Sequence, residues 1–214
     1  MTKNNSTKIT TSQHKNGDSQ KIVDSPIYLP LVIIVSGFIG LISSFMLAVE
    51  TVEYIKDPTK TLACNINPIV SCSSVIDTPQ GQIFGFMNPL LGVVAFSMLI
   101  VFGFAIFYKT KFPKWIWLSA QFVSLLGILF VHWLIFSSIY VLGSLCPYCM
   151  VVWLVTMPIA IYITLANAKS GMLGKSSNII GHFLSKFHIT ILLVWYAIIL
   201  ALIISHFGLS SLLA

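Results

Sequence analysis

Charged residues are scarce in this chain of 214 residues. They make up 8% of the sequence, hydrophobic residues make up 57%, and arginine is absent, so all twelve basic residues are lysines. A soluble globule of this size needs more polar side chains than this to cover its surface. The composition therefore excludes a soluble globular protein and predicts an integral membrane protein.

Several familiar functional motifs are also missing. The sequence contains no P-loop, no glycine-rich dinucleotide motif, no Ser/His/Asp arrangement and no internal repeat. The net charge of +6 arises from lysines scattered through loops, whereas a nucleic-acid interface needs a clustered basic face. We therefore set aside nucleotide-binding enzymes, serine hydrolases and nucleic-acid-binding proteins.

Five apolar stretches are each long enough to cross the hydrocarbon core of a bilayer, which takes about 20 helical residues. They are predicted at residues 27–49, 86–108, 115–140, 146–166 and 188–207. The expected fold is an all-α integral membrane protein, with a four-helix transmembrane bundle and a fifth C-terminal transmembrane helix. Residues 1–26 are polar and predict a disordered cytoplasmic tail. The core covers residues 27–166 with a loop at 50–85, and residues 167–214 form a cytoplasmic loop and the fifth helix.

The distribution of lysines predicts the orientation, because cytoplasmic loops collect basic residues. Lysines precede the first span and lie between the second and third spans and between the fourth and fifth. The 50–85 loop holds only Lys56 and Lys60, together with four of the six acidic residues. We therefore expect a multi-pass protein of the plasma or inner membrane with its N-terminus in the cytoplasm and its C-terminus outside.

All four cysteines are then expected on the extracytoplasmic side, where disulfides form and persist. Cys64 and Cys72 lie in the first loop, and Cys146-Pro-Tyr-Cys149 opens the fourth span. At a helix N-terminus, unpaired backbone N–H groups and the helix dipole stabilise the thiolate of the first cysteine. Pro147 suits this position because the N–H groups of the first helical turn form no hydrogen bonds within the helix, so the missing N–H of proline costs nothing there. Cys149 is expected about 4.5 Å deeper, toward the membrane.

Three kinds of function remain for these cysteines. Redox exchange is favoured by the CxxC spacing and the oxidising compartment. Two permanent structural disulfides in a non-catalytic membrane protein are the second possibility. A zinc site is the third, but the spacing Cys64-x7-Cys72 is not typical of zinc ligands, and we expect no metal.

Three motifs together resemble the vitamin K epoxide reductase family in its bacterial form. They are Cys64-x7-Cys72-Ser-Ser-Val75, Asn88-Pro-Leu-Leu-Gly92 and Cys146-Pro-Tyr-Cys149, and the resemblance covers about residues 28–166. It implies a four-helix bundle around a quinone, either ubiquinone or menaquinone. It also implies a thiol:quinone oxidoreductase that reoxidises an extracytoplasmic thioredoxin-like or DsbA-like partner and so supports disulfide formation in exported proteins.

The resemblance assigns a role to each cysteine. Cys149 would reduce the quinone, and Cys146 would exchange with Cys72 through a transient interloop disulfide. Cys64 would take electrons from the partner protein. Two resting arrangements remain open. One has the disulfides Cys64–Cys72 and Cys146–Cys149, and the other has a Cys72–Cys146 bridge.

Three further residues are candidates for quinone binding. Asn88 matches an asparagine that bonds a quinone carbonyl, with a helix cap or an interhelical bond as the alternative. Thr78 matches a serine or threonine position near the loop cysteines. Trp153 stands where relatives that reduce vitamin K carry a tyrosine, and an indole N–H can donate a hydrogen bond but supplies no proton. Reduction of vitamin K or its epoxide is therefore the less favoured enzymatic function, and packing in the core is the alternative for Trp153.

His132 is an ionisable residue inside the third span, which makes it a functional candidate. Proton delivery to the quinone is one role. A neutral histidine in an interhelical hydrogen bond is the other, and we favour it.

Overall fold

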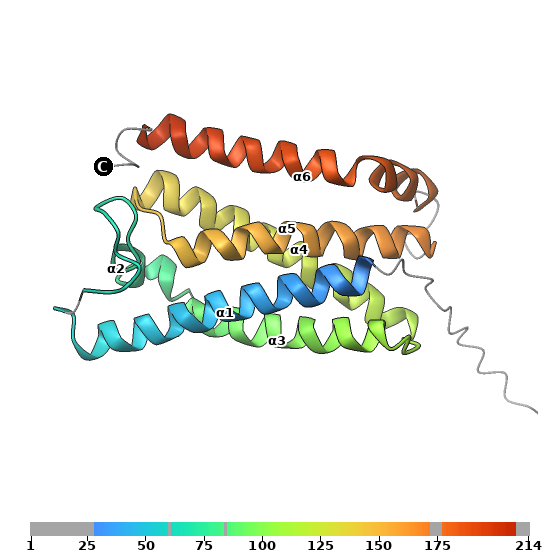
Figure 1. The fold of residues 1–214 in the computed structure, drawn as a ribbon, viewed down its shortest axis with the longest axis horizontal. Helices are drawn as coiled ribbons and strands as arrows, with labels where there is room; N and C mark the ends of the chain where they lie inside the picture. Colours follow the sequence, from blue (N-terminus) through green and yellow to red (C-terminus); the bar gives the residue numbers. More distant parts are fainter. Residues whose placement is uncertain (1–27, 60, 84, 172–176, 209–214) are drawn as a thin grey trace, which may run out of the picture.

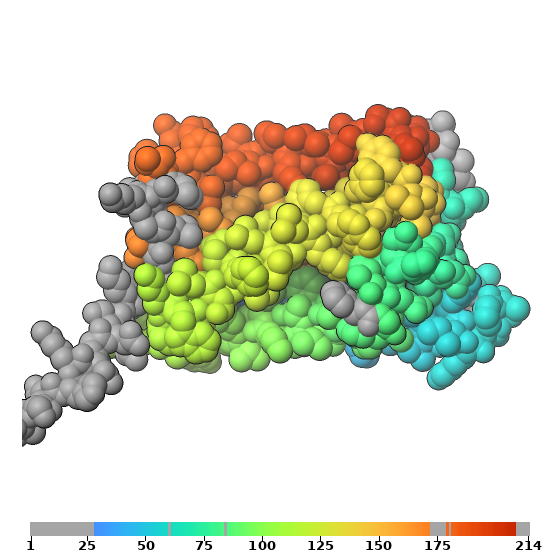
Figure 2. Space-filling view, turned by 180° about the vertical axis from the view of Figure 1, so that it is seen from behind, coloured from blue at the N-terminus to red at the C-terminus, as the bar shows by residue number. Residues whose placement is uncertain are grey.

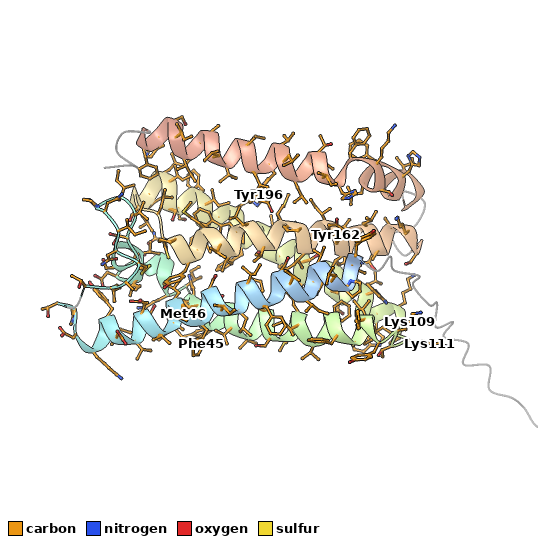
Figure 3. All side chains as sticks on the ribbon, viewed as in Figure 1. Phe45, Met46, Lys109, Lys111, Tyr162 and Tyr196 are labelled. Carbon is orange, nitrogen blue, oxygen red and sulfur yellow. A yellow bond between two sulfur atoms is a disulfide. The ribbon has the colours of Figure 1, made fainter. Side chains whose placement is uncertain are left out.

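The computed structural model describes residues 28–59, 61–83, 85–171 and 177–208, and the predicted tail at 1–26 lies outside them. Within these residues five helices are long and apolar enough to cross a membrane, and no β-strand is formed, which confirms the all-α prediction. The long helices are α1 (Tyr28–Lys56), α3 (Asn88–Phe107), α4 (Lys114–Phe136), α5 (Pro147–Lys169) and α6 (Ser177–Phe207). They run side by side along the long axis of the molecule (Figure 1). Exposed apolar side chains such as Phe45 and Met46 on α1 face outward, as expected for a lipid-facing surface (Figure 3).

Two helices are longer than predicted. α1 continues past residue 49 to Lys56, so the segment that joins it to α3 covers residues 57–87 instead of beginning at 50. α6 begins at Ser177 instead of 188. Hydropathy marks the part of a helix that lies in lipid, whereas the helix itself continues until a residue such as Pro58 ends it. The third span also continues beyond α4, as a π-helical turn, η2, over Ser137–Leu142.

α1 packs against α3 and α5, and α5 also packs against α4 and α6. The seam between α1 and α3 is tight because small residues line it. A Cβ atom at Gly40 would lie 2.4 Å from the Phe96 ring, and one at Gly92 would lie 2.3 Å from the Ser44 hydroxyl. Small residues let helix backbones approach closely in membranes. This seam holds α1 and α3 together as a pair.

α6 is attached to α5 at a point where α5 lacks a backbone hydrogen bond. Pro158, inside α5, has no N–H to donate to the carbonyl of Leu154 one turn earlier. The hydroxyl of Tyr196 on α6 donates to that carbonyl at 2.7 Å (Figure 3). A freed backbone carbonyl in a membrane needs such a partner, so this bond both satisfies α5 and fixes α6.

His132 forms the interhelical hydrogen bond that we favoured from the sequence. The indole Nε1–H of Trp195 on α6 donates to its Nε2 at 3.0 Å. Its Nδ1 lies 2.8 Å from the carbonyl oxygen of Ile128, one turn earlier on α4. A neutral ring with its proton on Nδ1 satisfies both contacts, so His132 joins α4 to α6.

The end of the bundle where α4 begins and α5 ends contains a buried polar cluster. The amide nitrogen of Asn167, which is fully buried, donates to the Trp117 carbonyl at 3.1 Å and to Gln121 Oε1 at 3.0 Å. Gln121 in turn donates to the hydroxyl of Thr164 at 2.9 Å. These bonds tie α4 to α5 through groups that would be costly to bury alone.

At the opposite end, residues 57–87 cover the bundle beside the start of α5 (Figure 1). This segment contains two short helices, α2 (Ser73–Ile76) and η1 (Pro79–Gly81). Leu62 and Ile76 from the segment pack with Leu47 of α1 and with three of the four cysteines, Cys64, Cys72 and Cys146. The segment is therefore a packed cap and brings the cysteines together.

Candidate active site

Cys146 is the N-cap residue of α5, as the sequence predicted. Its backbone is extended, Pro147 occupies the first turn, and its Sγ accepts a weak hydrogen bond from the backbone N–H of Cys149 at 3.5 Å. The sulfur therefore faces the positive end of the helix dipole. Cys149 lies one turn further along the helix.

The two cysteine pairs differ in oxidation state. Cys64 and Cys72 form a disulfide with their Cα atoms 5.7 Å apart, and Cys146 and Cys149 are free thiols. This matches neither arrangement that the sequence left open: the Cys64–Cys72 disulfide is formed, but Cys146 and Cys149 are bonded neither to each other nor to Cys72. This is not the arrangement of two permanent disulfides.

The two pairs meet at Cys72 and Cys146, whose sulfur atoms lie 3.5 Å apart. A short backbone pairing sets this distance. The N–H of Ser71 donates to the carbonyl of Leu145 at 3.0 Å, and the N–H of Leu145 donates to the carbonyl of Ile69 at 2.8 Å. Because each paired segment runs directly into a cysteine, the register of the pairing places the two sulfurs opposite each other.

Asn65 is a residue of the site that we did not identify from the sequence. Its side-chain oxygen accepts hydrogen bonds from the N–H of Cys72 at 3.0 Å, from the N–H of Ser73 at 3.3 Å and from the hydroxyl of Ser71 at 2.9 Å. Its position directly after Cys64 was the one available signal. Asparagine side chains commonly bond nearby backbone N–H groups in turns, but their target cannot be chosen from sequence.

The loop disulfide is buried. Cys64 is 4% exposed and Cys72 is 0% exposed, although the neighbours of Cys64 on both sides, Ala63 and Asn65, are exposed. The residue expected to meet a partner protein therefore lies just beneath the surface.

Cys146 precedes the membrane-spanning part of α5, and its pKa is lowered from the ordinary value for a cysteine. The main cause is the hydrogen bond from the thiol of Cys149, and backbone N–H groups of Cys149 and Tyr148 act in the same direction against the opposing effect of burial. The thiolate is the species that attacks disulfides. The lowered pKa therefore favours the reactive form of the sulfur that faces Cys72.

A cavity of about 650 Å³ lies between α1, α3, α4 and α5. Its lining is mostly apolar and includes Cys149 and Trp153 at one end and Ile163 at the other. Along α5, Cys149 and Ile163 are about 21 Å apart at 1.5 Å per residue. Figure 2 shows a hollow in this region of the surface, between α3 and α4. An apolar cavity of this size and shape suits the ring and part of the chain of a lipid quinone.

Trp153 lies on the same face of α5 as Cys149 and lines the cavity. Its side chain is 3% exposed, and its Nε1–H has no hydrogen-bond partner among the residues that the structure describes. An unpaired buried donor is costly unless a bound molecule supplies an acceptor. A quinone oxygen is such an acceptor, so this indole fits the expected ligand.

Asn88 and Thr78 lie in different settings. Asn88 lines the cavity, but its amide nitrogen donates to the Gln80 carbonyl at 2.6 Å and its oxygen accepts from the N–H of Ile83 at 3.2 Å. Thr78 donates its hydroxyl to the Val75 carbonyl at 2.7 Å and is not part of the lining. Both side chains thus hold the cap in shape, and of the two only Asn88 also reaches the cavity.

A search among curated proteins finds no match for this chain. The model of the vitamin K epoxide reductase family matches residues 31–164, which is more than half of the sequence and includes all four cysteines and the whole lining of the cavity. The members of this family are membrane oxidoreductases linked to quinones. The protein therefore belongs to the vitamin K epoxide reductase family and is a membrane redox enzyme.

Proposed function

We propose that the protein is a thiol:quinone oxidoreductase that oxidises an extracytoplasmic thioredoxin-like partner of the DsbA type and passes the electrons to a membrane quinone. This activity would support disulfide formation in exported proteins. The observation that carries the proposal is the 3.5 Å contact between Cys72 and Cys146, with Cys149 on the wall of a cavity large enough for a quinone.

The first exchange takes place between the partner and the loop pair. A thiolate of the partner attacks Cys64, a mixed disulfide forms, and Cys72 leaves as a thiolate. The partner's second thiolate then attacks its own half of the mixed disulfide and releases Cys64. Two electrons have moved to the loop pair, and the partner holds a disulfide. Because Cys64 is only 4% exposed, this step needs an outward movement of the loop.

The second exchange takes place between the two pairs. The Cys72 thiolate attacks Cys146 of a Cys146–Cys149 disulfide, a Cys72–Cys146 bond forms, and Cys149 leaves as a thiolate. Cys64 then attacks Cys72 and releases Cys146. The product has an oxidised loop pair and a reduced helix pair, which is the arrangement of cysteines described above.

A quinone held in the cavity would supply a two-electron, two-proton acceptor, and the helix pair would return to the disulfide by reducing it. Cys149 is the thiol on the cavity wall and makes this contact. The Trp153 N–H would be available to donate a hydrogen bond to a quinone oxygen, and Asn88 borders the same end of the cavity. The apolar lining excludes water from the reacting atoms. We assign Thr78 an indirect role, in holding the cap.

The orientation follows from the separation of charge and cysteines. Lys109 and Lys111 lie at the end of the molecule opposite to the cap (Figure 3). By the distribution of lysines this end faces the cytoplasm, so the cysteines face the outside of a plasma or inner membrane. Electron flow from the partner to the quinone is also energetically favourable. A DsbA-type disulfide is a strong oxidant, so its reoxidation needs a stronger electron acceptor such as a respiratory quinone.

The test is quinone reduction by the detergent-solubilised protein when a reduced DsbA-like protein is supplied. Ubiquinone, menaquinone and vitamin K epoxide are compared as acceptors, and Cys149→Ala is assayed beside the parent protein. Turnover with a quinone in the parent and none in the variant supports the proposed electron path. Absence of turnover with every acceptor, or full turnover in Cys149→Ala, would overturn it.

A further inference from the structure

Exchange between the two cysteine pairs makes a particular demand on Cys72. The Cys64–Cys72 disulfide has to break before Cys72 can bond to Cys146. Later the Cys72–Cys146 bond breaks and Cys72 bonds to Cys64 again. When the Cys64–Cys72 bond opens, the covalent closure of the loop over a separation of eight residues is lost. Something other than the disulfide must then hold Cys72 opposite Cys146.

The side chain of Asn65 closes the same loop without a covalent bond. Its oxygen accepts from the N–H groups of Cys72 and Ser73 and from the Ser71 hydroxyl, and its amide nitrogen donates to the Ser73 hydroxyl at 3.2 Å. These contacts join residue 65 to residues 71–73, so they span almost the same stretch as the disulfide. None of them involves a sulfur atom, so opening the disulfide does not itself remove any of these contacts.

The backbone on both sides of the contact is held as well. Cys72 and Ser71 are buried, so the N–H of Cys72 needs an acceptor within the protein, and Asn65 supplies it. The N–H of Ser71 is taken by the Leu145 carbonyl, one residue before Cys146. Two backbone hydrogen bonds therefore hold Cys72 in place: its own N–H donates to Asn65, and the N–H of Ser71 donates to Leu145.

We propose that Asn65 is a positioning residue that keeps Cys72 facing Cys146 whenever Cys72 is not bonded to Cys64. This inference rests on the proposed function and deepens it, since it names the group that makes the interloop exchange efficient. Asn65 touches neither a reacting sulfur nor the quinone. Its effect is to raise the effective concentration of one thiol at the other.

The test uses the full-length protein with only the two exchanging cysteines left, Cys64→Ala/Cys149→Ala. It is equilibrated with mixtures of reduced and oxidised glutathione, so that two protein thiols and one oxidised glutathione give the Cys72–Cys146 disulfide and two reduced glutathiones. The fraction of disulfide gives the effective concentration of the two thiols. We expect Asn65→Ala to lower it about tenfold, which corresponds to about 1.4 kcal/mol.

Two matched variants separate positioning from general stability. Asn65→Asp keeps an oxygen acceptor for both N–H groups and should restore the effective concentration to within about threefold of the parent. Ser73→Ala removes the partner of the Asn65 amide nitrogen but leaves the bonds to Cys72, so it should change the value by less than about twofold. Thermal unfolding of the reduced proteins, measured in parallel, should be close to that of the parent for Asn65→Asp and Ser73→Ala, whereas Asn65→Ala leaves the buried N–H of Cys72 without its acceptor and should unfold at a lower temperature.

The outcomes distinguish this inference from the function on which it rests. If Asn65→Ala forms the disulfide as readily as the parent, Asn65 does not position Cys72, whereas the exchange itself stands. If Asn65→Asp is as impaired as Asn65→Ala, the acceptor role is wrong. If the two-cysteine protein forms no disulfide and the four-cysteine protein reduces no quinone, the proposed function fails first.

Discussion

At one end of the bundle the buried polar side chains bond to one another, whereas at the cysteine end several are left for other molecules. The amide nitrogen of Asn167 donates hydrogen bonds to Gln121 and to the Trp117 carbonyl between α5 and α4, although its side-chain oxygen has no partner among the described residues. By contrast, Trp153 keeps an unpaired N–H at the cavity, and Cys146 and Cys149 remain free thiols. Hydrogen bonds between helices give stability, and groups that face a cavity without a partner are available for binding and chemistry. The comparison predicts that substitutions at the two ends affect different measurements.

The largest effect is expected at the cysteine end. Cys149→Ala should reduce partner-driven quinone reduction to the uncatalysed rate, because no thiol then lies on the cavity wall. Its melting temperature should stay near that of the parent, since Cys149 forms no disulfide in the structure. Met150→Leu, at the next position of the same helix, is the control and should keep full turnover. A large loss of stability in Cys149→Ala would contradict the division between the two ends.

The matching substitution at the other end is Asn167→Ala. It removes two hydrogen bonds between α4 and α5 and should lower the free energy of unfolding by about 1–3 kcal/mol. Turnover per folded molecule should remain close to that of the parent. Lys169→Ala, at the exposed end of α5, serves as control for both measurements. If Asn167→Ala left stability unchanged but abolished turnover, the two ends would not be separable.

Trp153→Phe tests the unpaired donor at the cavity. The substitution keeps an aromatic ring but removes the N–H, so the KM for quinone should rise about tenfold if this group bonds a quinone oxygen. Without quinone the variant should be no less stable than the parent, because a buried donor without a partner is removed. Trp133→Phe, on the lipid-facing side of α4, should change neither quantity. An unchanged KM in Trp153→Phe would assign the indole to packing alone.

A smaller effect is expected in the pH dependence of the ionisation of the Cys146 thiol. Its pKa is lowered mainly by the hydrogen bond from Cys149, so the thiolate persists to a lower pH than in an ordinary cysteine and is protonated as the pH falls through that pKa. Cys149→Ala removes the donor and should move the titration midpoint of Cys146 to higher pH. Ultraviolet thiolate absorbance, corrected with Cys146→Ala, reports the midpoint. A midpoint that stays the same or moves lower would contradict this cause.

Tyr196→Phe should give the smallest effect. It leaves the Leu154 carbonyl, which Pro158 cannot satisfy, without its donor from α6. Interhelical hydrogen bonds in membranes contribute about 0.6 kcal/mol on average, so only a small decrease in the melting temperature is expected. Turnover should be unaffected, because α6 does not line the cavity. A severe loss of turnover would place α6 within the catalytic unit.

The sequence predicted the helices well because each buries a long apolar stretch in lipid, a requirement that can be read residue by residue. It also predicted that Cys146 begins a helix, since Pro147 and the CxxC spacing are local signals. The bounds of α1 and α6 were less accurate, because their polar ends remain helical outside the apolar stretch.

The contacts that set the geometry of the site could not be predicted. The pairing of Val70 with Leu145 involves too few residues to produce a strand pattern. The bonds of Asn65 depend on how the loop folds back, and the bond from Tyr196 to Leu154 depends on where α6 packs. Such contacts between distant segments are properties of the tertiary structure and leave no periodic signal in the sequence.

The burial of the Cys64–Cys72 disulfide has a consequence for selectivity. With exposures of 4% and 0%, these two cysteines are almost completely covered by the surrounding protein. In the proposed function, a partner protein that binds the cap and displaces the chain around Cys64 would react with these sulfurs faster than a small thiol would. If the proposed function holds, such a cap would favour oxidation of a docked partner protein over oxidation of small thiols in solution.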